Sequence, residues 1–334
     1  MRSTKKPAAL AAAALLLGLA PAKAQTEHTS MVMPALAYVF LSTYVAEDAG
    51  IWAKEGLDVK VSFVSGVGAF NAVLTGSADF SNSSGLTIDR AAARGQRLLA
   101  IANVLNRLPL DVVIRKDIAE AAHFDPAAPL LQRAKIIAGR TMAVDGLGSI
   151  VHGDLLDVMK AGEVDPQGVQ ITPMQPADML AAFARKSIDG FSNGPPWPQR
   201  VLTDGSAVLV ASGEKGEPPG LYPLAFGLIV ARPQFCQDHR SICLKMGHSM
   251  VEAAKFIHEH QDETRAILKK RFPDIPDKAA EASFEEVRDN TPLSPVVTEE
   301  ALANADKMNL EAGLIKPADA LSSYKGLSTD EFVR

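Results

Sequence analysis

The sequence lacks the residue patterns that many cofactor-dependent and metal-dependent enzymes require. It contains no phosphate-binding Gly-Lys-Ser/Thr loop, and Gly66 and Gly68 are not followed by the third glycine of a dinucleotide-binding motif. His258 and His260 are two residues apart, so on a helix they would point to different sides and would not form a metal-binding pair. We therefore expect no cofactor, no metal site and no enzyme activity.

Cysteine is scarce, with only Cys236 and Cys243 in the chain. On one continuous helix their Cα atoms would lie roughly 10 Å apart, which is too far for a disulfide. A bridge therefore requires Cys236 to lie off the helix that carries Cys243, and Arg232-Pro233 just upstream and Asp238 as an N-cap favour such a break. We expect a disulfide that stabilises the fold by about 2.5 kcal/mol, the alternative being two buried thiols. In neither case do we expect a catalytic cysteine.

Long apolar runs are also scarce. The run from Ala8 to Ala20 follows three basic residues and precedes Ala22-Lys-Ala24, the pattern of a secretory signal peptide with its cleavage site. It is shorter than the ~20 residues that a membrane helix needs. Residues 1–24 are therefore predicted to be removed on export to the periplasm. Gln25 would then be the first residue, so the cysteine of a lipid-anchored protein is absent.

Positive charge is in the minority, with 34 basic against 39 acidic residues and a net charge of −5. Removal of the signal peptide takes away four basic residues and no acidic ones, and the remaining balance of 30 against 39 is −9. An acidic exported protein is not expected to bind nucleic acid. The remaining ~310 residues are more than a single hydrophobic core usually contains, so we expect two lobes.

The sequence does contain a weak internal repeat. Asp79-Phe-Ser-Asn82 recurs as Asp189-Gly-Phe-Ser-Asn193, each time after a short apolar helix and a small polar turn. The two copies are roughly a hundred residues apart, which suits two similar domains better than a solenoid. Ligands of open α/β sheets bind beyond the carboxyl ends of the strands, so two such loops predict a two-sided cleft.

Hydrophobic patterning supports two α/β lobes. We assign residues 25–113 and 228–334 to the first lobe and residues 114–227 to the second. Helices are expected between the strands, and the chain is expected to cross between lobes near 111–115 and 226–231, which would form the hinge. The expected strands are Thr29–Met33, Leu57–Phe63, Leu98–Asn103, Arg140–Val144 and Val169–Pro173.

Six segments carry a resemblance to a known family: Ala46-Glu-Asp-Ala-Gly-Ile-Trp-Ala-Lys-Glu-Gly-Leu-Asp-Val59, Gly76-Ser-Ala-Asp79, Gly139-Arg-Thr-Met-Ala-Val144, Ser187-Ile-Asp189, Pro196-Trp197 and Glu311-Ala-Gly-Leu-Ile315. Through them nearly the whole mature chain resembles the periplasmic substrate-binding proteins of bacterial ABC transporters, of the nitrate/sulfonate/taurine type. Binders of thiamine-pyrimidine precursors belong to the same group. The resemblance implies a type II periplasmic binding protein fold, in which each lobe is a mostly parallel sheet flanked by helices and a two-stranded hinge joins the lobes.

The resemblance also implies a function. A monomer of this type clamps a small molecule, such as a sulfonate, nitrate or taurine, and delivers it to an ABC permease in the inner membrane. A pyrimidine precursor or another heteroaromatic is the alternative ligand, and a ligand-sensing role beside a membrane receptor is the alternative task. A synthase of the thiamine pyrimidine shares the fold, but it carries clustered cysteines and works in the cytosol. One departure is Pro195, where many relatives carry glutamate.

Candidate ligand contacts follow from the expected cleft. Glycines before helix starts leave backbone N–H groups free, serines add hydroxyl groups, and Tyr38, Trp197 and Phe226 can form apolar walls. These groups suit a sulfonate, a carboxylate or nitrate, and they also suit a neutral pyrimidine. The residues expected to contact the ligand are Tyr38, Ser65, Gly66, Gly68, Ser81, Asn82, Ser83, Gly148, Ser149, Ser192, Asn193 and Trp197.

Overall fold

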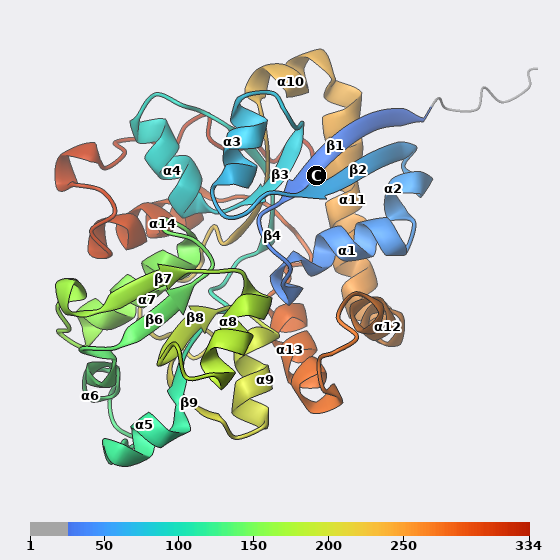
Figure 1. Ribbon diagram of the computed structural model, residues 1–334. Helices are drawn as coiled ribbons and strands as arrows, with labels where there is room; N and C mark the ends of the chain where they lie inside the picture. Colours follow the sequence, from blue (N-terminus) through green and yellow to red (C-terminus); the bar gives the residue numbers. More distant parts are fainter. Residues whose placement is uncertain (1–25) are drawn as a thin grey trace, which may run out of the picture.

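The protein folds as two α/β lobes, each built on a five-stranded sheet (Figure 1). The structure is a computed structural model and describes residues 26–334, so the predicted signal peptide lies outside the described residues. The first-lobe sheet has the order β2-β1-β3-β10-β4, with β1 (Glu27–Met33), β2 (Leu57–Phe63), β3 (Phe80–Ser83), β4 (Leu99–Leu105) and β10 (Gly227–Ala231). The second-lobe sheet has the order β7-β6-β8-β5-β9, with β5 (Asp111–Arg115), β6 (Thr141–Val144), β7 (Gln170–Pro173), β8 (Gly190–Asn193) and β9 (Ala207–Ser212).

The two sheets share one topology. In the first lobe β1 pairs in parallel with β2 and β3, and β10 is antiparallel to β3 and β4. In the second lobe β6 pairs in parallel with β7 and β8, and β5 is antiparallel to β8 and β9. Each sheet is thus mostly parallel. Its one antiparallel strand, β10 in the first lobe and β5 in the second, directly follows a segment in which the chain crosses between the lobes. The predicted two-lobed α/β fold is confirmed.

The sequence repeat marks equivalent positions in the two sheets. Oδ2 of Asp79, just before β3, accepts a hydrogen bond from the Ser30 N–H of β1 over 2.9 Å. Oδ2 of Asp189, just before β8, accepts one from the Thr141 N–H at the start of β6, also over 2.9 Å. Each aspartate therefore ties the central strand of its lobe to the neighbouring parallel strand.

The crossings lie beside the segments that we expected from the sequence. Residues 111–115 and 227–231 are strands β5 and β10, and hydrogen bonds from neighbouring strands hold both of them inside the sheets. The chain crosses instead at 106–110 and 213–226. These two segments are joined by hydrogen bonds from the Gly213 N–H to the Leu110 carbonyl and from the Leu224 N–H to the Asn106 carbonyl, both over 2.8 Å.

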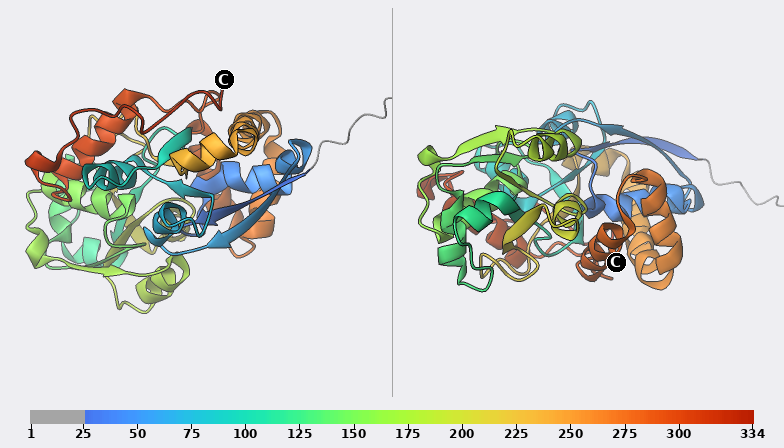
Figure 2. Two further views of the ribbon diagram at one scale, coloured as in Figure 1. Left: turned by 90° about the horizontal axis from the view of Figure 1, so that it is seen from above. Right: turned by 60° about the horizontal axis from the view of Figure 1, so that its bottom comes forward.

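Helices cover the sheets, and short 3₁₀ turns link some of them, such as η1 (Tyr38–Phe40). In Figure 2 the helices α11 and α12 lie beside α1 in both views. The first lobe has α1 (Leu41–Asp48), α2 (Ile51–Lys54), α3 (Gly68–Leu74), α4 (Gly85–Ala93), α10 (Pro233–Asp238), α11 (Arg240–Glu259) and α12 (Gln261–Arg271). The second lobe has α5 (Lys116–Ala121), α6 (Leu130–Arg133), α7 (Ile150–Ala161), α8 (Pro176–Ala184) and α9 (Trp197–Thr203).

The last two helices, α13 (Asp277–Asp289) and α14 (Glu299–Glu311), contact both lobes. Helix α14 packs against α4 of the first lobe and α7 of the second, as Figure 1 shows. Helix α13 packs against η1 of the first lobe and α9 of the second, where Nε2 of Gln199 donates a hydrogen bond to Oε2 of Glu286 over 2.8 Å. The C-terminal segment thus connects the lobes in addition to the two crossings.

A disulfide joins Cys236 of α10 to Cys243 of α11. The helical run is interrupted at His239, between α10 and α11, and this break brings the two Cα atoms to 5.6 Å. Within residues 26–334, no helix is both long enough and apolar enough to cross a membrane.

Candidate functional site

A cavity of about 80 Å³ lies between the lobes, at the carboxyl ends of β1, β3, β6 and β8. Asn82 is the second-last residue of β3 and Asn193 is the last residue of β8, and both line the cavity. The two asparagines are the equivalent members of the sequence repeat, so the repeat places one carboxamide on each side of the same space. Ligands of open α/β sheets bind at such strand ends, and we take this cavity as the candidate site.

Two helices begin at the cavity. Ser84 precedes α4 in the first lobe, and Ser149 precedes α7 in the second. The Ser149 hydroxyl accepts a hydrogen bond from the His152 N–H over 3.1 Å, as an N-cap residue does. This local pairing follows directly from the sequence, where a serine precedes an apolar helical pattern.

A carboxyl group faces the cavity beside the start of α7. Oδ1 of Asp145 accepts a hydrogen bond from the Ser149 hydroxyl over 2.5 Å. Burial raises the pKa of Asp145 to about 6, although the hydrogen bonds from Ser149 and from the Gly146 backbone act in the opposite direction. Asp145 is therefore mostly ionised at neutral pH and can accept a hydrogen bond from a ligand.

The rest of the lining is largely apolar. Phe40, Phe70 and Phe226 contribute aromatic rings, and Leu110 and Val151 contribute aliphatic side chains. No lysine, arginine or histidine belongs to the lining. The nearby Arg90 instead donates a hydrogen bond to the Gly148 carbonyl across the lobes.

The lobes touch around the cavity, so the structure is closed. Nε2 of Gln175 in the second lobe donates a hydrogen bond to Oγ of Ser65 in the first lobe over 2.7 Å. A Cβ atom placed on Gly146 would lie 3.6 Å from Cα of Gly66, which shows how closely the two loops approach. Glycine is also favoured at position 66 by the backbone, because a φ of +56° is left-handed and residues with a Cβ atom rarely adopt it.

The structure places five of the predicted contact residues in the lining, namely Gly66, Asn82, Ser83, Ser149 and Asn193. Phe226, predicted as an apolar wall, also belongs to it. Ser65, Gly68 and Gly148 lie in the same loops but outside the lining. Ser65 and Gly148 instead make the contacts between the lobes described above, and Gly68 is the first residue of α3.

Ser81 and Ser192 do not reach the cavity, because they are interior residues of β3 and β8 and their side chains are fully buried. Alternate residues of a strand face opposite sides, so Ser192 turns away from the space that Asn193 lines. Its hydroxyl donates a hydrogen bond to Oδ2 of Asp154 in α7 over 2.8 Å. Residues 190–194 have the Gly-x-Ser-x-Gly spacing of hydrolases. This buried serine, bonded to an aspartate, is not an exposed nucleophile.

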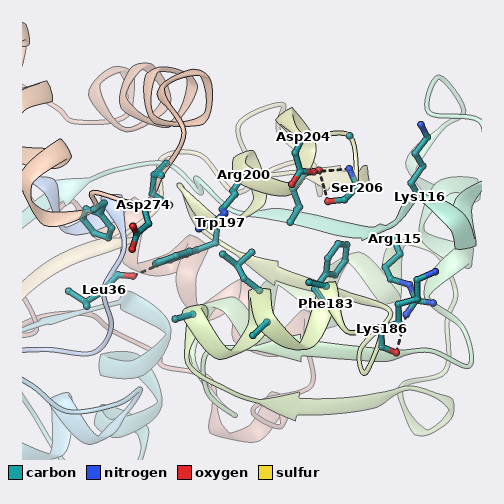
Figure 3. A pocket seen from close by; sticks show the side chains of 18 of the residues that line it. Leu36, Arg115, Lys116, Phe183, Lys186, Trp197, Arg200, Asp204, Ser206 and Asp274 are labelled. Atoms are coloured by element: carbon teal, nitrogen blue, oxygen red, sulfur yellow. Dashed lines mark hydrogen bonds between the residues drawn. The ribbon is translucent and has the colours of Figure 1, made fainter.

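Tyr38 and Trp197 also lie outside the cavity lining. Tyr38 is 1% exposed and packs against Phe272, with ring centroids 4.9 Å apart. Trp197 points away from the cavity toward a second hollow, and its Nε1–H donates a hydrogen bond to the Leu36 carbonyl over 3.0 Å (Figure 3). The Trp197 ring thus joins the two lobes, whereas Tyr38 reaches the second lobe through its backbone N–H, which donates to the Pro195 carbonyl over 2.8 Å.

The second hollow has a volume of about 1000 Å³ and lies between α8, α9 and residues 271–275. Charged side chains at its far end pair with one another. Asp117 accepts hydrogen bonds from Nε of Arg115 over 3.0 Å and from Nζ of Lys186 over 2.7 Å. Because the hollow includes neither strand-end asparagine, we do not take it as the candidate site.

Sequence reasoning missed several lining residues, above all Asp145, Thr87 and Phe70. Asp145 directly follows β6, in the loop whose glycines and serine were singled out, so its position after a strand was the available signal. Thr87 and Phe70 lie on helices, and only the packing of these helices in the folded protein determines that their side chains face the cavity. Among residues 26–334, no group of three or more histidine, cysteine, aspartate or glutamate side chains is arranged to hold a metal ion.

Comparisons with known proteins agree with this architecture. A protein of Bordetella bronchiseptica RB50 has a similar structure, with a TM-score of 0.76 and 20% identity over 92% of this chain and 95% of that one. The alkanesulfonate-binding protein SsuA of Xanthomonas axonopodis pv. citri gives a TM-score of 0.69 and 16% identity over 88% and 96% of the two chains.

The periplasmic nitrate-binding protein NrtA of Synechocystis PCC 6803 gives a TM-score of 0.68 and 14% identity over 92% of this chain and 87% of that one. SsuA and NrtA are binding proteins by name, and at these identities they support the fold alone. No curated protein sequence matches the chain. The model of the NMT1-like family matches residues 35–271, which include nine of the ten strands and every lining residue of the cavity except Pro34. The chain therefore belongs to the NMT1-like family.

Proposed function

We propose that this chain is an exported solute-binding protein that captures a small molecule between its lobes and delivers it to an ABC importer. The observation that carries the proposal is the cavity at which equivalent strand ends of the two lobes meet, with Asn82 on one side and Asn193 on the other. Closure around such a space removes the ligand from water, and opening about two crossing segments releases it.

The location and partner follow from the same proposal. The N-terminal signal peptide predicted at residues 1–24 would direct the chain to the periplasm, where an inner-membrane permease could recognise the closed form. The related proteins are named for binding alkanesulfonates and nitrate, which suggests a small solute rather than a polymer. The small volume of the cavity, about 80 Å³, also favours a small solute.

Two measurements test the proposal. A thermal-shift screen of sulfonates, nitrate, carboxylates and pyrimidines should identify a compound that raises the melting temperature, because a ligand that binds only the folded state stabilises it. Small-angle scattering should then show that this compound lowers the radius of gyration of the purified mature protein. A radius of gyration that stays unchanged at saturation would contradict capture by closure.

Export is tested separately. The N-terminal sequence of protein recovered from a periplasmic extract should begin at Gln25. Protein that retains residues 1–24, or that is found only in the cytoplasm, would contradict the proposed location.

A further inference from the structure

We infer that the cavity selects a ring compound that is uncharged or cationic and donates a hydrogen bond to the Asp145 carboxylate, and that it discriminates against oxyanions. This inference rests on the proposed function, because it names the class of ligand that the cavity between the lobes would hold. It separates this chain in specificity from proteins of the same fold that are named for sulfonate or nitrate.

The Asp145 carboxylate is the charged group of the cavity lining. Its Oδ1 accepts the Ser149 hydroxyl, and the backbone N–H groups of Gly146 and Asp145 also bond the carboxylate. A carboxylate has about four acceptor positions, so one is left for a donor on a ligand. A carboxylate and an oxyanion in the same enclosed space repel each other strongly, because little water is present to screen them. A ligand N–H or ammonium group is instead attracted.

No basic side chain of the lining compensates for this charge. Arg90 is directed to the Gly148 carbonyl. Nδ1 of His152 accepts a hydrogen bond from the Gly148 N–H over 2.9 Å, and burial followed by the charge of Arg90 lowers the pKa of His152. His152 therefore stays neutral and does not supply a cation near the cavity.

The helix starts at the cavity do not reverse this preference. The N-terminus of α7 would favour an anion because of the helix dipole. The carboxylate of Asp145 already occupies this place, because it is hydrogen-bonded to the N-cap residue Ser149. At the start of α4, the Gly85 N–H donates to the Ala225 carbonyl over 2.7 Å and is not free for a ligand.

The shape of the ligand follows from the other lining residues. Phe40 and Phe70 of the first lobe, together with Phe226, surround the space with aromatic surface. The carboxamides of Asn82 and Asn193 also line it, and each is held by a hydrogen bond within its own lobe, to Thr43 and from the Gly194 N–H respectively. Aromatic side chains pack well against flat rings. A planar ring with one donor group therefore matches both parts of the lining.

A matched series of three probes tests the inference: benzamidine, benzamide and benzoate carry cationic, neutral and anionic head groups of similar shape on the same phenyl ring. Calorimetry at pH 7.5 with the purified mature protein should give at least tenfold tighter binding for benzamidine or benzamide than for benzoate. Nitrate and methanesulfonate, measured alongside, should also bind at least tenfold more weakly than the better of these two probes.

The variant Asp145→Asn removes the charge and keeps an acceptor for Ser149. It should reduce the preference for benzamidine over benzoate at least tenfold, whereas Asp165→Asn, at an exposed position of the same lobe, should leave the preference unchanged. A pH titration of the wild-type protein gives a second measurement that needs no variant. Benzamidine affinity should fall as the pH drops below about 6, where Asp145 becomes protonated.

The inference would be overturned if benzoate, nitrate or methanesulfonate bound more tightly than both benzamidine and benzamide. The proposed function would then remain intact. An unchanged preference in Asp145→Asn, or a benzamidine affinity that is constant between pH 5 and pH 7.5, would also overturn it. If none of the five compounds binds at ~10 mM, the inferred ligand class is wrong. The scattering experiment with a ligand found by the screen then decides the proposed function independently.

Discussion

The indole N–H of Trp197, in the second lobe, donates a hydrogen bond over 3.0 Å to the backbone carbonyl of Leu36, in the first lobe (Figure 3). The ring also packs against Phe272, with centroids 6.2 Å apart. The bond joins the two lobes beside the cavity, so it belongs to the closed arrangement and would be broken by opening. Trp197 thus acts on closure without lining the cavity.

Trp197→Phe should therefore weaken ligand binding about fivefold, because it removes one hydrogen bond worth ~1 kcal/mol from the closed form and keeps most of the ring contacts. Calorimetry with the compound found by the screen measures this loss. The control is Trp52→Phe, because Trp52 is buried in the first lobe at α2, away from the second lobe. An equal loss in both variants would show that Trp197 acts only through general stability.

Gly146→Val should hold the lobes apart. The added Cβ would lie in van der Waals contact with Cα of Gly66, at 3.6 Å, and the two methyl groups beyond it add bulk at this close approach of the lobes. We expect a larger radius of gyration and at least tenfold weaker ligand binding, with the thermal unfolding of the open form little changed.

Gly168→Val is the matched control in the same lobe. A Cβ atom on Gly168 meets no atom within 4 Å, so this variant should close and bind as the wild type does. Wild-type affinity in Gly146→Val would contradict the closed arrangement of the loops that carry Gly66 and Gly146.

Ser149→Ala should lower the free energy of unfolding by about 1 kcal/mol, because α7 loses the hydroxyl that accepts the His152 N–H. The same change removes the hydrogen bond that opposes the raised pKa of Asp145, so this pKa should rise further above about 6. Urea unfolding measures the first effect. Ser149→Thr keeps a hydroxyl and should recover most of the stability, and a loss equal to that of Ser149→Ala would argue against the cap.

Asp89→Asn should stabilise the protein at alkaline pH. Asp89 is fully buried in α4, and neither of its carboxylate oxygens has a hydrogen-bond partner in the described part of the chain. Burial, and then the charge of Asp306, raise the pKa of Asp89 to about 9. The folded protein therefore retains a proton that the unfolded chain releases near pH ~4.

The contribution of Asp89 to stability is complete below about pH 4 and is lost as the pH rises to about 9. Asparagine does not titrate, so the variant does not lose stability in this way. The urea concentration at its unfolding midpoint should therefore exceed that of the wild type by an amount that grows steadily from pH 5 to pH 9. Asp319→Asn, at an exposed position, is the control and should show no such trend. Parallel pH profiles of Asp89→Asn and the wild type would contradict the raised pKa.

Much of the fold could be predicted because its signals are local. The alternation of Leu57, Val59, Val61 and Phe63 predicts an edge strand, and β2 lies at the edge of its sheet. The Asp-Phe-Ser-Asn repeat predicts two similar units, and its two copies begin the equivalent strands β3 and β8. Pro233, upstream of the two cysteines, and Asp238, between them, favour a helix break, and the structure has this break at His239, where the disulfide forms.

The candidate site was less predictable, because the direction of each side chain depends on its strand register and on the partner lobe. Ser192 and Asn193 are neighbours in the sequence, yet only Asn193 lines the cavity, since adjacent strand residues face opposite sides. Asp145 resembles an ordinary loop residue until the lobes enclose it.

By itself, the sequence determined the two-lobed α/β architecture, the helix start at Ser149 and the equivalence of Asn82 and Asn193. The first two features depend on hydrophobic period and capping, which act within a few turns of chain, and the third can be read by comparing two segments of the sequence directly. Only the tertiary structure decided that Trp197 joins the lobes while Asp145 faces the cavity without a basic partner in its lining. The Trp197 bond joins residues 161 positions apart, and residues of both lobes line the cavity that Asp145 faces, so both outcomes are set by the packing of one lobe on the other.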